Sequence, residues 1–130
     1  MDQADSIWNR AALEGGGASP GAGDTALAAA LLLHSSAMSG GVLDAVETLT
    51  DEELDAAEAG YRWLHVPAAS EAIAAVRREI ADGALDDPQR ASALEMSADD
   101  HYDEAIEDDA ALDSAFRARL KTDPDAFSPV

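Results

Sequence analysis

The sequence predicts an all-α fold, a compact single domain of about six or seven helices. Apolar residues recur at helical spacing along most of the 130 residues, and helix start and stop signals separate the segments. No stretch alternates between apolar and polar residues as a strand would. Hydrophobic residues, mostly alanine and leucine, make up 47% of the chain, which is enough for a modest core.

The N-terminal part is predicted to be an amphipathic piece and a connector over residues 1–23, followed by an acidic helical domain over residues 24–130. The amphipathic piece carries Ile7, Trp8, Ala11 and Leu13. Residues 15–23 read GGGASPGAG, and glycine, proline and serine in such density are typical of a flexible connector.

Three helices are predicted in the first half of the acidic domain. Asp24 has the side chain of an N-cap residue, and the helix after it is expected to reach Met38, with His34 and Met38 on its buried face. A Ser-Gly-Gly sequence ends this helix, and a short helix follows. Thr50 and Glu53 have the spacing of a capping box, which predicts the start of a third, amphipathic helix.

Three further segments complete the predicted domain. Pro67 suits the first turn of the next helix. Another begins at Pro88 and is expected to bend near Ser97, ahead of a piece that contains residues 99–109. The last predicted helix covers residues 109–121, before an Asp-Pro sequence that cannot continue it.

The charge of the chain indicates the class of partner. The 27 acidic and 8 basic residues give a net charge of -19. Phosphates are bound through lysine and arginine, so we expect no direct binding to nucleic acid or to an anionic membrane, and a basic protein as partner. The absence of cysteine excludes disulfides, thiolate catalysis and cysteine-ligated zinc.

The N-terminal sequence and the hydropathy pattern favour a soluble, cytoplasmic protein. The first residues carry no positively charged region of the kind that opens a secretory signal. The apolar run over residues 26–33 is too short to span a bilayer.

Negative charge is densest in residues 99–109, DDHYDEAIEDD, where seven of eleven side chains are carboxylates. On a helix, carboxylates four positions apart lie about 6 Å apart along the axis, and each such pair destabilises the helix by a few tenths of a kcal/mol. Asp99 and Asp103, Asp100 and Glu104, and Glu104 and Asp108 are pairs of this kind. Rows of carboxylates can imitate the phosphates that a DNA-binding protein recognises, although an acidic surface also keeps ordinary proteins soluble.

The candidate partner-binding residues form two acidic faces. The first consists of Glu95, Asp99, Asp100, Asp103, Glu104, Glu107, Asp108 and Asp109. The second, which would extend it, consists of Asp51, Glu52, Asp55 and Glu58.

Metal binding fits the sequence of the acidic stretch less well than the binding of a basic protein does. An EF-hand loop that began at Asp99 would need glycine and glutamate where Glu104 and Ala110 stand. No histidine follows a glutamate at the spacing of a di-iron helix bundle. We therefore expect no metal and no cofactor.

Hydrolytic chemistry is the least favoured function. His34 is followed by Ser35 and Ser36, but no recognised motif surrounds them, and adjacent helix positions do not face each other. We expect His34 to be a core histidine that donates to a backbone carbonyl. A metal-dependent hydrolase built on His34 or His101 stays as an alternative to the expected absence of enzyme activity.

The order of segments carries a family resemblance. Five pieces, LLLHSSAMSGGVLDAVE at residues 31–47, AGYRW at 59–63, YDEAIEDD at 102–109, LD at 112–113 and DPDAF at 123–127, resemble the small acidic DNA-mimic-protein domain family of bacteria. The partial match covers residues 24–127. The family's asparagine position holds Ser39, and Val42 and Leu43 replace its aromatic residues. The resemblance implies an all-α domain, a homodimer and an acidic surface that occupies the DNA-binding face of a transcription factor, without enzyme activity.

A second kind of partner fits the same surface. An immunity-type antagonist would use it to cover the active cleft of a basic toxin, such as a nuclease. A neighbouring toxin gene would favour this alternative, and a neighbouring repressor gene would favour the mimic.

Overall fold

The computed structural model describes residues 2–130, and over these residues it contains seven α-helices, two short 3-10 turns and no strand. The all-α prediction is confirmed. The α-helices are α1 (Gln3–Glu14), α2 (Ala22–Gly40), α3 (Val42–Thr48), α4 (Asp51–Trp63), α5 (Pro67–Ala81), α6 (Pro88–Ala105) and α7 (Asp109–Thr122). The 3-10 turns are η1 (Ala84–Asp86) and η2 (Pro124–Ala126).

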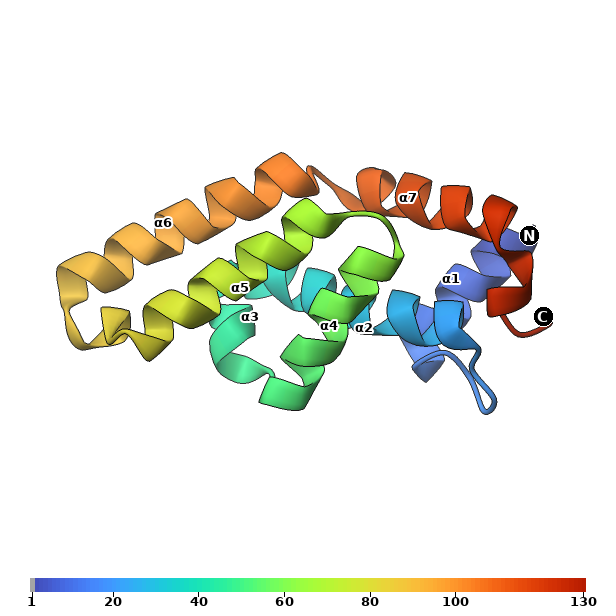
Figure 1. Ribbon diagram of the computed structural model, residues 1–130, viewed down its shortest axis with the longest axis horizontal. Helices are drawn as coiled ribbons and strands as arrows, with labels where there is room; N and C mark the ends of the chain where they lie inside the picture. The colour runs from blue at the N-terminus through green and yellow to red at the C-terminus, as the bar shows by residue number, and fades with distance from the viewer. Residues whose placement is uncertain (1) are drawn as a thin grey trace.

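Helix α2 is the centre of the fold (Figure 1). Helices α1, α3 and α4 pack against it, α5 packs against α4, and α6 lies beside α5 in the opposite direction. Helix α7 continues from the end of α6, in roughly the same direction, to α1 and the C-terminal segment. The α5–α6 pair therefore lies at one end of the molecule, and α1, α7 and η2 lie at the other.

One hydrophobic core includes the first helix. Ile7 of α1, Tyr61 of α4 and Phe116 of α7 are all fully buried within it. Helices α2 and α4 cross closely at Gly60, where a Cβ atom would clash with the carbonyl oxygen of Ala26. Because Ile7 is part of this core, α1 belongs to the same domain as the remaining helices, whereas the sequence suggested a separate piece.

Several helix ends lie where the local signals predict them. Thr50 and Glu53 form the capping box of α4, with bonds of 2.9 and 3.1 Å. Pro67 is the first residue of α5, and Gly41, with φ of 94°, follows the end of α2. The prediction that Asp24 caps α2 is wrong. The N-cap of α2 is Gly21, and Asp24 is the third residue of the helix.

Helix α6 continues through the bend predicted near Ser97. The Ser97 hydroxyl donates to the carbonyl oxygen of Leu94 at 3.2 Å, so its hydrogen bond is made inside the helix. The helix ends at Ala105, and residues 106–108 form a non-helical link to α7. The predicted helical pairing of Glu104 with Asp108 is therefore wrong.

Candidate acidic binding surface

The carboxylates of the first predicted face all lie on the surface of α6, the link after it and the first turn of α7. Each of the eight residues is exposed. On α6 they occupy two sides of the helix. Asp99 and Asp103 border a hollow beside α2 and α3, whereas Asp100 and Glu104 line a groove beside α5.

Three of these carboxylates bind groups within the molecule. Asp99 Oδ1 accepts the backbone N–H of Val42 at 2.9 Å, which places a negative charge at the N-terminus of α3. Asp108 is the N-cap of α7 and accepts the N–H of Ala111 at 2.9 Å. Asp109 Oδ1 lies 2.6 Å from His34 Nε2, although its side chain is still 79% exposed. These three residues therefore have structural roles.

Five carboxylates of the same face accept no hydrogen bond and form no ion pair with any of residues 2–130. We call them the unpaired acidic set: Glu95, Asp100, Asp103, Glu104 and Glu107. Beyond Arg90, α6 contains no arginine or lysine that could neutralise them. Their charge is consequently presented to solvent.

The negative charge of the second predicted face, on α4, is largely compensated by an arginine of the neighbouring helix. Arg77 of α5 lies 2.8 Å from Asp55 and 3.7 Å from Asp51, and it also donates to Glu58. The hydrogen bond to Asp55 is the main cause that raises the pKa of Arg77. Glu52 is exposed and has no such partner within the described chain. Because α5 packs between α4 and α6, the two acidic faces do not form one continuous surface.

A chain of polar side chains runs from the surface into the core. His34 Nδ1 lies 2.9 Å from the Tyr102 hydroxyl, which lies 2.7 Å from the Tyr61 hydroxyl. His34 Nε2 faces Asp109. The expected bond from His34 to a backbone carbonyl is therefore wrong, since both ring nitrogens have side-chain partners. The three aromatic residues join α2, α4 and α6, and Asp109 adds α7.

Burial sets the protonation of the two tyrosines. It raises the pKa of Tyr61 well above its ordinary value and is also the largest cause of the raised pKa of Tyr102. Both phenols are therefore neutral at physiological pH and act as hydrogen-bond partners. Neither Ser35 nor Ser36 forms a hydrogen bond to His34 within the described chain, because the two ring nitrogens of His34 contact Tyr102 and Asp109.

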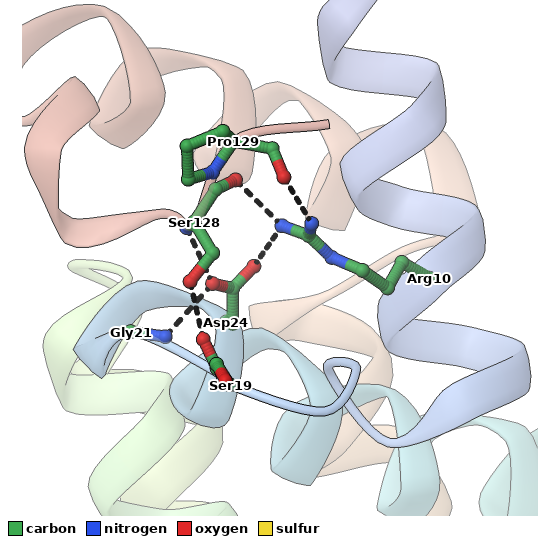
Figure 2. Close-up of polar contacts among 6 residues, drawn as sticks. All are labelled: Arg10, Ser19, Gly21, Asp24, Ser128 and Pro129. Atoms are coloured by element: carbon green, nitrogen blue, oxygen red, sulfur yellow. Dashed lines mark hydrogen bonds and ion pairs between the residues drawn. The ribbon is translucent and has the colours of Figure 1, made fainter.

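A second polar cluster joins the two ends of the chain (Figure 2). Arg10 donates to Asp24 at 2.8 Å and to the carbonyl oxygens of Ser128 and Pro129 at 2.8 and 2.9 Å. Asp24 is fully buried and also accepts the N–H groups of Gly21 and Ser128. The cluster fixes the glycine-rich segment, which the sequence predicted to be a flexible connector, against α1 and the C-terminal residues.

Sequence reasoning missed this cluster because it read Asp24 only as a helix cap. The sequence did contain a signal for the Arg10–Asp24 pair, because arginine is scarce in a chain so rich in carboxylates. Arginines are the residues that would stabilise any buried acid, so Arg10 on an amphipathic helix was a candidate partner.

Comparison with known proteins gives no relative. No family model, curated protein or solved structure matches the chain. The resemblance to the acidic DNA-mimic family stays a prediction. Among residues 2–130, no three histidine, aspartate or glutamate side chains are arranged to hold a metal ion, and none of the helices has the length and apolar character needed to cross a membrane.

Proposed function

We propose that this protein is a non-enzymatic binding protein that presents the acidic surface of α6 to a basic, DNA-binding protein, such as a transcription factor. The observation that supports this function best is the unpaired acidic set. Asp51, Asp55 and Glu58 of α4 lie beside Arg77, whereas these five have no cation as partner among the described residues. Unpaired charges of one sign repel one another, so keeping them together costs stability and indicates a use for the charge.

The geometry of α6 supports recognition by a protein that binds DNA. Asp99 and Asp103 are one turn apart on one side of the helix, and Asp100 and Glu104 are one turn apart on another. Each pair is separated by about 6 Å along the axis, and the two pairs give adjacent rows of negative charge. A basic groove or helix that neutralises DNA phosphates would meet a similar pattern of charge here.

The experiment is capture of partners from the host's lysate by three tagged proteins. The first is the wild type. The second has the unpaired acidic set replaced by amides: E95Q, D100N, D103N, E104Q and E107Q. The third is a control that loses the same charge at exposed acidic residues elsewhere: E14Q, E47Q, E71Q, D82N and D125N. Captured proteins are identified by mass spectrometry at low and at raised salt.

We expect the wild type and the control to enrich the same basic DNA-binding protein, and the second variant to lose it. The interaction should weaken as salt rises, because screening reduces the attraction between exposed charges. DNA that carries the partner's binding site should compete with this protein for the partner. Equal recovery by all three proteins would refute the proposal, and capture of a basic nuclease would assign the antagonist function instead.

A further inference from the structure

An open groove lies between α5 and α6. It has a volume of 630 Å³, and buried small or apolar side chains form its floor, among them Ala72, Val76 and Ala98. Along α6 it extends from Arg90 to Glu104, which at 1.5 Å per residue is about 21 Å. A partner helix of about four turns has the same length.

The charge of the groove differs along its length. At one end, Arg90 donates to Glu79 at 3.2 Å, and the two charges compensate each other. At the other end, Asp100 and Glu104 of the unpaired acidic set line the groove. Arg90 is the one arginine or lysine in the lining formed by the described residues. The groove therefore combines an apolar floor with uncompensated negative charge on one wall.

We propose that this groove binds an amphipathic basic helix of the partner protein. A stripe of small or apolar residues on that helix would face the floor, and its lysines or arginines would reach Asp100 and Glu104. The small side chains Ala75, Ala93 and Ser97 in the lining allow the axis of a third helix to approach closely, since interaxial distance depends on the side chains at the contact. The proposal rests on the function proposed above and names the element of the partner that is recognised.

The negative charge of the groove favours a basic helix over a second copy of this protein as the occupant. Another copy would bring its own net charge of -19 to a wall that is already negative, and the two would repel each other. A cationic helix complements that wall.

The probe is a synthetic lysine-rich peptide of about fourteen residues, a length that matches the groove at the helical rise. Its alanines and leucines form one helical stripe, and a scrambled peptide of identical composition lacks the stripe. Binding of each labelled peptide to the full chain is measured by fluorescence anisotropy, and amide chemical shifts in NMR spectra locate the binding site. We expect the striped peptide to bind more tightly than the scrambled one and to shift the amides of Ala75, Ala93 and Ser97.

Two pairs of variants distinguish binding in the groove from nonspecific attraction to the negative charge of the protein. Ala93→Trp fills the groove from an exposed position, and Ser92→Trp adds the same side chain one residue away, outside the lining. We expect A93W to weaken binding of the striped peptide at least about tenfold, the effect of losing one well-buried apolar side chain, and S92W to leave affinity unchanged. The double variant D100N and E104Q should weaken binding more than the control E14Q and D125N, which removes the same charge at the other end of the molecule.

Each contrary result overturns the inference in a distinguishable way. If the striped peptide does not bind, if both peptides bind equally, or if A93W binds like S92W, the groove does not accept a basic helix. If A93W converts a dimer into a monomer in light scattering, the occupant is a second copy. If A93W captures the same host protein as the wild type while the five-residue amide variant does not, the proposed function stands and the groove inference fails.

Discussion

At the scale of single residues, Tyr61 and Tyr102 connect the acidic surface to the core. Their hydroxyl groups lie 2.7 Å apart, and Tyr102 also contacts His34, which faces Asp109 at the surface. Buried polar groups without partners cost free energy, so each of these four side chains stabilises the position of the next. The start of α7 and the end of α6 are thereby held in a fixed relation to α2 and α4.

The two tyrosines give a prediction about alkaline pH. The pKa of each is raised in the folded protein, first by burial, above the value of about 10 expected in the unfolded chain. A raised folded pKa means that above about pH 10 the unfolded chain has released protons that the folded chain retains. The stabilising contribution is thus fully present below about pH 10 and is lost as the pH rises further, towards the folded values.

Phenolate absorbance measures this effect directly, because the chain has only 2 tyrosines. We expect the native protein to form phenolate at a higher pH than the protein in concentrated urea. The free energy of unfolding should fall above about pH 10, and it should fall less steeply in Tyr102→Phe than in the wild type. Coincident titration curves for native and unfolded protein would contradict the burial argument.

At the scale of elements, neighbouring carboxylates on α6 have opposite effects on stability. Asp99 accepts the first N–H group of α3 at 2.9 Å, and α3 has only 7 residues. A carboxylate at the N-terminus of so short a helix satisfies a free donor and interacts favourably with the helix dipole. Asp103, one turn later, has no such partner within the described chain and lies beside other carboxylates.

We therefore predict that Asp99→Ala lowers the free energy of unfolding by about 0.5–2 kcal/mol, as the loss of an N-cap does. Asp103→Ala should leave it within about 0.5 kcal/mol of the wild type or raise it slightly, since it removes a repulsive neighbour. Urea unfolding followed by circular dichroism measures both variants. Equal losses in the two would show that Asp99 contributes nothing specific to α3.

At the scale of the whole molecule, the net charge of -19 sets the response to salt. Repulsion among surface carboxylates destabilises the compact state, and dissolved ions screen it over about 10 Å at 0.1 M ionic strength. The same screening weakens the ion pairs of Arg77 and Arg117, but those pairs involve far fewer charges than the excess. Repulsion is therefore the larger effect.

We predict that raising sodium chloride from about 0.05 to 0.5 M increases the melting temperature of the wild type. The five-residue amide variant should show a smaller increase, because it carries less uncompensated charge. Differential scanning calorimetry on both proteins provides the measurement. A melting temperature that falls with salt in the wild type would mean that the ion pairs, not the repulsion, dominate.

The sequence determined those features whose causes lie within a few residues of one another. The capping box at Thr50, the proline at the start of α5 and the glycine after α2 each act within one turn, so the helix ends followed from local signals. The exposure of the carboxylates on α6 followed from helical periodicity. The all-α fold class could be predicted for the same reason, and the bend expected at Ser97 failed because a hydroxyl can bond within a continuous helix.

Only the tertiary structure decided which carboxylates have a partner within the molecule and which do not. Asp99 meets Val42 across 57 positions of the chain, Asp109 meets His34 across 75, and Asp24 meets Ser128 across 104. Periodicity within one helix carries no information about such distant partners, because they depend on how the helices pack. The same packing places Arg77 beside Asp51, Asp55 and Glu58 of α4 and leaves the unpaired acidic set of α6 and the link after it facing solvent. The composition of the chain made it acidic, and the packing of its helices determined where that acidity is available to a partner.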